Sequence, residues 1–278
     1  MSTPATPTLA LSGGARIPQV GLGTWPMDGA TVERVVPAAV GAGYRLFDTA
    51  ENYENERGVG RGLRAAGVPR EELFVTTKFN KRWHSVDGVR QACEASLERL
   101  NLDYVDLFLI HWPNPDQDRY VDAFQGLLEL RRTGLVRAIG TSNFTPAHLQ
   151  RVIDETGSAP EVNQLQINPY VVQEEGRAFA AQHGIVVQSW SPLARGPELR
   201  SEPVVTELAL KYGRTPAQIV LRWHIELGLV PVPKSEDLRR LRENITVFDF
   251  TLTPEEVARL AGLDRGTELV LDPETFGH

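Results

Sequence analysis

Four reactive side chains follow one another at the ends of short apolar segments in this 278-residue chain. Tyr44–Asp48 ends in a carboxylate, and the phenol of Tyr53 follows shortly after it. Leu73–Lys78 ends in an amine and Val105–His111 in an imidazole. If these segments are neighbouring parallel strands, about 4.8 Å apart, their last residues meet at one small patch. The sequence therefore predicts that a carboxylate, a phenol, an amine and an imidazole share one site.

These residue types suit a proton donor that works near neutral pH. Tyrosine titrates near pH 10, and the ammonium of Lys78 is expected to lower the pKa of Tyr53. Asp48 would pair with Lys78, and a neutral His111 would donate a hydrogen bond to a carbonyl oxygen. Singly, each residue also fits an ordinary role as a cap, a solvated strand end, a packed histidine or a loop tyrosine. Their occurrence on successive strands favours the chemical interpretation.

Other kinds of catalysis and partners fit less well. No serine or cysteine adjoins His111 as a nucleophile, and no second histidine stands at metal-ligand spacing, so no metal is expected. The net charge is −7 with scattered basic residues, which argues against a nucleic-acid partner. The single cysteine, Cys93, fits a reducing compartment. Without a signal-peptide pattern or an apolar run of about 20 residues, we expect a cytoplasmic protein with no membrane partner.

Strand-like and helix-like segments alternate along the chain after a hairpin-like segment, Leu9–Pro18, that turns at Gly13-Gly14. The expected strands are Val20–Trp25, Tyr44–Asp48, Leu73–Lys78, Val105–His111, Val136–Thr141, Val162–Ile167, Ile185–Trp190 and Leu229–Val232. The expected helices are Ala30–Ala42, Arg57–Ala66, Val86–Leu100, Tyr120–Arg132, Pro146–Glu155, Gln173–His183, Val204–Tyr212, Pro216–Leu227, Asp237–Phe248 and Pro254–Leu263. Proline near helix starts and glycine just past helix ends support these boundaries.

Eight strand–helix units in about 250 residues predict an α/β fold, a closed (β/α)8 TIM barrel with an N-terminal β-hairpin and an extra C-terminal helix. A doubly wound open sheet would carry a glycine-rich first turn. Here Gly21-Leu-Gly23 is followed by Thr24-Trp-Pro, which lacks the third glycine. No linker-like stretch divides the chain, so residues 1–278 are expected to form a single domain. Barrel enzymes carry their chemistry at the carboxyl ends of the strands, where the four reactive residues fall.

Ordered motifs along the chain resemble those of the aldo-keto reductases, in particular the short bacterial members. The motifs are Gly23-Thr-Trp25, Phe47-Asp-Thr-Ala50, Tyr53-Glu-Asn, Thr77-Lys78, Ile110-His-Trp-Pro113, Gly140-Thr-Ser-Asn-Phe144, Asn163-Gln164, Ser189-Trp-Ser-Pro-Leu193, Pro233-Lys-Ser235, Arg240 and Glu243-Asn244. The resemblance covers nearly the whole chain. It implies a reductase that moves hydride from NADPH to an aldehyde or ketone, with Tyr53 as general acid, Lys78 and Asp48 tuning it, and His111 orienting the carbonyl.

The same resemblance implies an extended cofactor across the barrel mouth. It assigns Ser142, Asn143 and Gln164 to the carboxamide and Trp190 to stacking on the nicotinamide. It assigns Thr24, Ser191 and Leu193 to the ribose and phosphates, and Glu243 and Asn244 to the adenine.

The far end of the cofactor can also be inferred from residue chemistry. Lys234 and Ser235 follow the last strand, near a helix start that suits a phosphate, and Arg240 adds a planar cation. Two cations favour a ribose 2′-phosphate, hence NADPH, with NADH as a weaker alternative. Glu236 departs from the small or apolar residue usual in the family, and its carboxylate should weaken a strict NADPH preference.

Aromatic residues just past the strand ends predict a pocket for a small carbonyl substrate. Trp25, Trp83 and Trp112 match the family's substrate walls beside His111, whereas His84 is expected at the surface. Since the 113–120 loop is short and little chain follows Leu263, an open pocket with broad tolerance is expected.

Two rival functions remain open at this point, and the chain is expected to act as a monomer in each case. A catalytically idle, nucleotide-binding regulatory protein could share the fold, although all four reactive residues are retained. A Schiff-base aldolase would use Lys78 as its amine, but pairing with Asp48 would keep that amine protonated.

Overall fold

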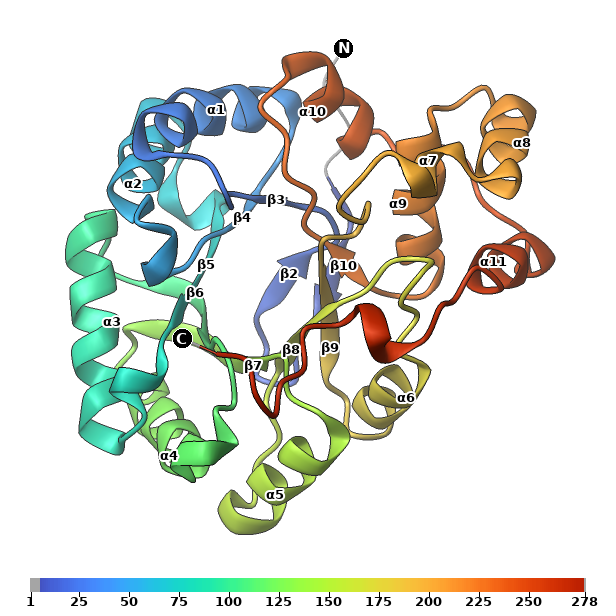
Figure 1. Cartoon of the computed structure of the whole chain (residues 1–278). Coiled ribbons are helices and arrows are strands. Elements are labelled where there is room, and N and C mark those ends of the chain that lie inside the picture. Colours follow the sequence, from blue (N-terminus) through green and yellow to red (C-terminus); the bar gives the residue numbers. More distant parts are fainter. Residues whose placement is uncertain (1–5, 278) are drawn as a thin grey trace.

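Eight parallel strands form the central barrel of the protein (Figure 1). The structure, a computed structural model, describes residues 6–277. In sheet order the strands run β10-β9-β8-β7-β6-β5-β4-β3. A hydrogen bond of 3.3 Å from Gly23 N to Pro233 O joins the first strand to the segment after the last. The strands are β3 (Gly21–Gly23), β4 (Leu46–Asp48), β5 (Phe74–Phe79), β6 (Val105–Ile110), β7 (Val136–Ser142), β8 (Val162–Gln166), β9 (Val186–Trp190) and β10 (Val230–Pro231). The predicted barrel is confirmed.

Helices surround this barrel and cover the outer face of its strands, as Figure 1 shows. They are α1 (Gly29–Ala42), α2 (Glu56–Ala65), α3 (Val86–Leu100), α4 (Tyr120–Arg131), α5 (Pro146–Thr156), α6 (Glu174–Gln182), α7 (Glu198–Ser201), α8 (Pro203–Tyr212), α9 (Pro216–Glu226), α10 (Leu238–Ile245) and α11 (Pro254–Ala261). Five 3-10 turns join them: η1 (Glu51–Tyr53), η2 (Arg70–Glu72), η3 (Lys81–Trp83), η4 (Pro115–Gln117) and η5 (Thr267–Leu269). The short helix α7 is not among the helices expected from the sequence.

Local signals in the sequence set several helix boundaries. Thr145 and Thr215 each cap a helix and precede a proline in its first turn, in α5 and α9 respectively. Gly43 and Gly157 end α1 and α5 with φ angles of 110° and 70°, a left-handed conformation that favours glycine. These caps turn the chain from each helix back towards the next strand.

The core has an outer and an inner part. The larger cluster fills the space between strands and helices, and β6 is buried along its whole length because both of its faces are covered. The smaller cluster lies inside the barrel, where Leu46, Leu107 and Val230 pack together. Leu11 and Ile17 belong to the same cluster and come from the hairpin formed by β1 (Thr8–Ala10) and β2 (Arg16–Pro18). The hairpin therefore closes the amino end of the barrel, called the floor here, and leaves the carboxyl end, the mouth, for chemistry.

The chain after α11 returns to the mouth. In Figure 1 this red segment passes from α11 across the front of the barrel and ends near β6 and α4. Gln166 Nε2 donates a hydrogen bond of 3.1 Å to Leu269 O, and Glu274 Oε1 lies 3.0 Å from His148 Nε2. Two separate contacts thus hold the tail against the barrel. No helix within residues 6–277 is long and apolar enough to cross a membrane.

Candidate active site at the barrel mouth

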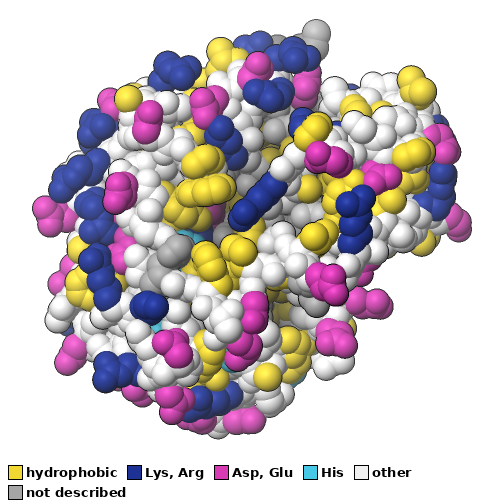
Figure 2. All heavy atoms as spheres, viewed as in Figure 1, with side chains coloured by type: hydrophobic (Ala, Val, Ile, Leu, Met, Phe, Trp, Pro, Cys, Tyr) yellow, Lys and Arg dark blue, Asp and Glu magenta, His cyan; other side chains and the backbone are white. Residues whose placement is uncertain are grey.

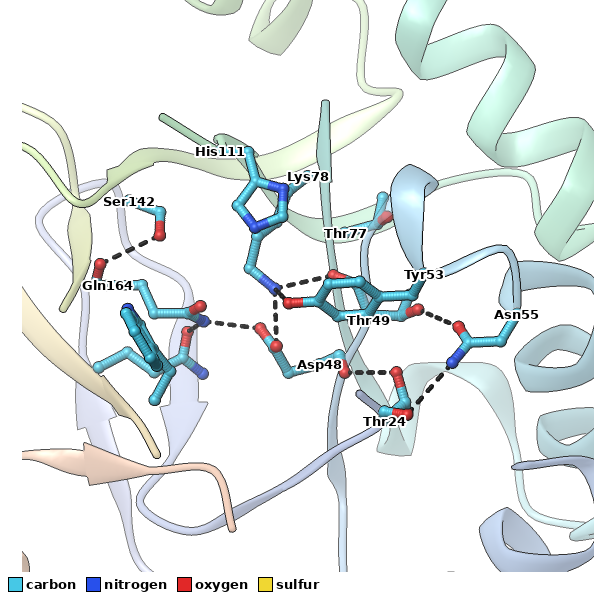
Figure 3. Close-up of polar contacts among 12 residues, drawn as sticks. Thr24, Asp48, Thr49, Tyr53, Asn55, Thr77, Lys78, His111, Ser142 and Gln164 are labelled. Atoms are coloured by element: carbon cyan, nitrogen blue, oxygen red, sulfur yellow. Dashed lines mark hydrogen bonds and ion pairs between the residues drawn. The ribbon is translucent and has the colours of Figure 1, made fainter. Parts of the chain in front are cut away.

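Three adjacent strands and one turn bring the four reactive residues together (Figure 3). Asp48 is the last residue of β4, Lys78 lies near the end of β5, and His111 directly follows β6. β4 pairs with β5 and β5 with β6 in parallel, so their carboxyl ends lie side by side. Tyr53 ends the 3-10 turn η1, which follows β4 after a short loop.

A buried carboxylate fixes the turn that carries Tyr53. Glu51, in the same turn, accepts hydrogen bonds of 3.2 Å from Asn80 N and 3.0 Å from Trp83 Nε1, and Arg82 Nη2 lies 3.3 Å away. These partners all belong to the loop after β5. Since Lys78 lies on β5, Glu51 ties the position of the phenol to the strand that carries the amine.

Lys78 is the centre of the polar network drawn in Figure 3. Its Nζ lies 2.7 Å from Asp48 Oδ1, 2.9 Å from Thr49 O and 3.5 Å from the hydroxyl of Tyr53. The second carboxylate oxygen of Asp48 accepts a 2.7 Å hydrogen bond from Gln164 Nε2. Burial opposes the charge on Lys78, but Asp48 and then Tyr53 outweigh burial and raise the pKa of the ammonium above its ordinary value. Lys78 is therefore protonated at neutral pH.

The pKa of Tyr53 departs from the sequence-based expectation in its direction. Burial raises the pKa of the phenol, Lys78 lowers it, and Asp48 raises it again, so that the sum is upward. The ammonium alone would lower this pKa, as the sequence predicts, but the desolvation of the hydroxyl outweighs it. The consequence is that Tyr53 holds its proton at neutral pH and can donate it.

His111 faces the same space as Tyr53. The two ring centroids lie 5.8 Å apart with their planes at 73°, and the backbone carbonyl of His111 accepts a 3.0 Å hydrogen bond from Asn143 Nδ2. The imidazole and the phenol therefore border the same space.

These groups line a cavity of about 640 Å³ at the mouth. Figure 2, in the same view as Figure 1, shows hydrophobic side chains gathered near the centre of this face with basic side chains among them. The predicted site residues that line the cavity are Thr24, Trp25, Asp48, Tyr53, His111, Trp112, Ser142, Asn143, Gln164, Trp190, Ser191, Leu193 and Lys234. Lys78 lies behind this surface, fully buried.

One wall of the cavity is a connected set of amides and an indole. Trp190 Nε1 donates a 2.9 Å hydrogen bond to Asn143 Oδ1, and Asn143 Nδ2 donates to Ser142 Oγ at 3.0 Å. Ser142 Oγ in turn donates to Gln164 O at 3.1 Å. The network holds the half-buried indole of Trp190 as a flat face on the cavity, which suits a planar heteroaromatic ring.

The far arm of the cavity ends at the start of α10. Lys234 lines this arm, and its Nζ lies 2.5 Å from Glu236 Oε1. Asp237 caps α10 by accepting a 3.0 Å hydrogen bond from Arg240 N, while the Arg240 side chain is exposed. Of the cofactor residues predicted here, Ser235, Arg240, Glu243 and Asn244 are not among the residues that line the cavity.

The substrate side differs in part from the expectation. Trp25 is 52% exposed and lines the cavity, as does Trp112. Trp83 does not line it, because its indole turns to Glu51. His84, expected at the surface, is 2% exposed, and burial lowers its pKa to about 4.

Sequence reasoning also missed the contribution of the C-terminal tail to the rim. Leu271 and Phe276 line the cavity, and the ring of Phe276 lies edge-on to Trp112 at 4.7 Å. The rim is thus less trimmed than the shortness of the tail implied. Asn52, next to Tyr53, and Arg195, after β9, also line the cavity and were not singled out. Across residues 6–277, no group of three or more His, Cys, Asp or Glu side chains could hold a metal ion.

Comparison with known proteins assigns this arrangement to a family. The model of the Aldo/keto reductase family matches residues 17–265. The chain belongs to this family. Membership makes it an NAD(P)H-dependent oxidoreductase and agrees with the barrel fold.

Individual aldo/keto reductases resemble the chain over almost its entire length. It is 48% identical over 272 residues to 2,5-diketo-D-gluconic acid reductase B of a Corynebacterium species, covering 98% of each chain. It is 49% identical over 273 residues to methylglyoxal reductase DkgA of Yersinia pestis, again covering 98% of each. Among solved structures, an aldo-keto reductase of Bombyx mori in complex with NADP has a TM-score of 0.88 at 38% identity, covering 94% of each chain. A mutant of Gox0644 in complex with NADPH has a TM-score of 0.93 at 39% identity, covering 98% and 99%.

Proposed function

We propose that the protein reduces aldehydes and ketones to alcohols with NADPH, and that Tyr53 supplies the proton. The observation that carries this proposal is the Tyr53 hydroxyl, 3.5 Å from a buried ammonium that is itself paired with Asp48. As the carbonyl oxygen gains negative charge, the phenol donates its proton to it, and the charge of Lys78 stabilises the phenolate that remains. His111, on the other side of the same point, orients the carbonyl by a hydrogen bond.

The residues at the mouth fit a nicotinamide dinucleotide, which when bound supplies the hydride. Trp190 offers its flat face to the nicotinamide ring, and Ser142, Asn143 and Gln164 lie next to it with groups that suit a carboxamide. Thr24, Ser191 and Leu193 line the arm that leads to Lys234 and would hold the ribose and phosphates. Ser235, Arg240, Glu243 and Asn244 lie beyond the cavity, on and just before α10, where an extended cofactor would end.

Small, oxygen-rich carbonyl compounds are the substrate class that the cavity supports best. Trp25, Trp112 and Phe276 give it apolar walls, whereas Asn52 adds an amide beside the proton donor. The relatives named after 2,5-diketo-D-gluconic acid and methylglyoxal suggest the same class.

Cofactor choice depends on the start of α10. The two cations, Lys234 and Arg240, favour a 2′-phosphate, but Lys234 is paired with Glu236 and the helix start is capped by Asp237. We infer that NADPH is preferred and that NADH is accepted to a measurable extent. The variant Arg240→Ala should raise the Michaelis constant for NADPH by about tenfold and leave that for NADH nearly unchanged, because only NADPH carries the phosphate. An equal effect on both cofactors would contradict the assignment.

The decisive test of the reaction class follows NADPH absorbance with a panel of aldehydes, diketones and keto-sugars. Consumption of NADPH with formation of the alcohol is expected for several of them. Tight NADPH binding without turnover of any carbonyl would instead indicate an idle, nucleotide-binding regulator. Trapping of a substrate adduct on Lys78 by borohydride would indicate the aldolase, which the raised pKa of this ammonium disfavours.

A further inference from the structure

One guanidinium on an outer helix contacts two buried carboxylates that lie behind the proton donor. Arg99 belongs to α3, which lies outside the barrel beside α2 (Figure 1). Its Nε lies 2.5 Å from Glu56 Oε2, and its Nη2 lies 3.8 Å from Glu51 Oε2. The side chains of Glu51 and Glu56 are 3% and 1% exposed. The guanidinium therefore supplies positive charge to two carboxylates that have lost almost all of their water.

Each of these carboxylates is connected to one side chain of the proton donor. Glu51 and Tyr53 belong to the same turn, η1. Glu56, the first residue of α2, accepts a 2.6 Å hydrogen bond from Thr77 Oγ1. Thr77 directly precedes Lys78 on β5, and both are labelled in Figure 3. A shift of either carboxylate therefore changes the distance between the phenol and the ammonium, which is 3.5 Å.

Burial makes this arrangement depend on the cation. Within residues 6–277, Arg99 is the one cation that forms an ion pair with Glu56. Burial raises the pKa of the Glu56 carboxyl, and the hydrogen bond from Thr77 and the charge of Arg99 oppose this rise. Glu51 has a second cation, Arg82, at 3.3 Å. A buried carboxylate that loses its cation takes up a proton or moves towards water, and either change weakens its contacts.

We propose that Arg99 is a positioning residue for carbonyl reduction. It holds Glu51 and Glu56 in place, and through these carboxylates it sets the distance between the phenol and the ammonium. The inference rests on the proposed function, in which Tyr53 donates the proton. Arg99 touches no reacting group, because it borders a separate cavity of about 260 Å³ that shares no lining residue with the cavity at the mouth. Its effect therefore passes through the protein.

Loss of Arg99 should also change the pH dependence of the reaction. Tyr53 is close to Lys78, Asp48 and His111, and the other charged residues lining the cavity beside Arg99 are Glu51, Glu54, Glu56, Arg57 and Arg82. Removing the guanidinium takes away a positive charge and weakens the contact between ammonium and phenol, and both effects raise the pKa of Tyr53. Oxidation of an alcohol requires the phenolate, which accepts the proton. The rise of this rate with pH should therefore move to higher pH.

The test compares the wild type with Arg99→Met and with the matched control Arg131→Met. Arg131 Nη1 lies 3.1 Å from Oε1 of Glu161, a carboxylate 2% exposed that directly precedes β8 at the floor. The control thus also takes an arginine away from a buried carboxylate. In Arg99→Met, single-turnover oxidation of NADPH by an aldehyde should slow about tenfold, and the dissociation constant of NADPH should not change. The pH of half-maximal alcohol oxidation should rise by about one pH unit. Arg131→Met should behave as the wild type in all three measurements.

Arg99→Lys serves as the conservative variant and also replaces Arg99→Met if circular dichroism shows that the latter does not fold. A single ammonium keeps the charge beside Glu56 but cannot reach both carboxylates as the planar fork does, so both changes should be smaller than in Arg99→Met.

Three results would overturn the inference. The first is a wild-type rate in either folded variant of Arg99. The second is a slower rate with an unchanged pH profile, which would limit Arg99 to a role in the fold. The third is an equal loss in Arg131→Met, which would show that any broken ion pair slows the reaction. Failure of the proposed function looks different, since the wild type itself would then oxidise NADPH with no aldehyde.

Discussion

Asp48 and Asp106 are two carboxylates buried to the same degree at opposite ends of the barrel, with side chains 4% and 3% exposed. Asp48 ends β4 at the mouth, whereas Asp106 lies near the start of β6 at the floor. Each is paired with a cation at short range: Asp48 with Lys78 at 2.7 Å, and Asp106 with Arg70 at 2.6 Å. A buried carboxylate paired with a cation therefore occurs at both ends, but the cation is a fully buried lysine at the mouth and a partly exposed arginine at the floor.

At the floor, the groups around Asp106 contact one another and the backbone. Asp106 also accepts hydrogen bonds of 2.9 Å from Val75 N and 3.3 Å from Arg137 Nη1. The guanidinium groups of Arg70 and Arg137 lie over the ring of Tyr104 at 4.1 and 4.0 Å. Tyr104 thus contacts both cations through the faces of its ring. The contacts of Arg70, Asp106 and Arg137 connect η2, β6 and β7.

At the mouth, the cation contacts the tyrosine through its hydroxyl. Lys78 presents a compact ammonium to the oxygen of Tyr53, and the phenol borders a cavity. At the mouth, the ion pair can assist a proton donor, because its cation contacts a tyrosine hydroxyl that a ligand can reach. Where planar cations cover a tyrosine ring, the same charges only stabilise the fold.

The largest expected effect comes from removing the ammonium at the mouth. Lys78→Met should lower kcat for carbonyl reduction by about a hundredfold or more, because the charge that stabilises the phenolate of Tyr53 is lost and the phenol keeps its proton more firmly. NADPH binding should change little. Circular dichroism verifies folding, and Lys211→Met, on the surface of α8, is the matched control. Wild-type turnover in Lys78→Met would show that the ion pair at the mouth, like the one at the floor, takes no part in catalysis.

Removing the carboxylate at the floor should act on stability alone. Asp106→Ala leaves the buried N–H of Val75 without its acceptor and the two arginines without their anion, so the free energy of unfolding should fall by about 2 kcal/mol. The kcat of the folded variant should equal that of the wild type. A fall in kcat without a fall in stability, measured by urea unfolding, would show that the floor takes part in catalysis.

A smaller, pH-dependent effect is expected from the buried His84 near the mouth. Its pKa is about 4 in the folded protein and about 6.5 when unfolded, so the unfolded chain takes up the proton first as the pH falls. The stability gained from neutral His84 is therefore complete above pH 6.5 and is lost between pH 6.5 and pH 4. Between pH 7 and pH 5.5 the wild type should lose about 1 kcal/mol more than His84→Gln in urea unfolding. Equal losses in both proteins would show that His84 is not buried in its neutral form.

Regular elements could be predicted from the sequence because their signals are local. The expected helix Val86–Leu100 coincides with α3, whose serine cap lies in the adjacent residue. The strands are mostly shorter than expected, as in β3 (Gly21–Gly23), because the pairing of β3 with β4 covers only these three residues. Helix α7, with only four residues, has no periodicity to detect.

The parts of the site that were missed depend on contacts between distant segments. His84 follows two basic residues and a tryptophan, and only the packing of η3 against Phe79 reveals its burial. Phe276 reaches the mouth because the tail folds back across the barrel. Arg195 lies in an irregular loop, where nothing in the nearby sequence shows that Trp25 is its neighbour. By contrast, the meeting of the polar residues at the strand ends could be predicted, because β4, β5 and β6 are parallel neighbours.

The central claim is that Tyr53 gives its proton to the carbonyl oxygen, and Tyr53→Phe tests it most directly. Single-turnover oxidation of NADPH by an aldehyde and the dissociation constant of NADPH are measured on the same variant. We predict that NADPH binds with nearly wild-type affinity while its oxidation slows by about a hundredfold or more. Oxidation at the wild-type rate in Tyr53→Phe would contradict the claim and would assign the proton to another group at the mouth.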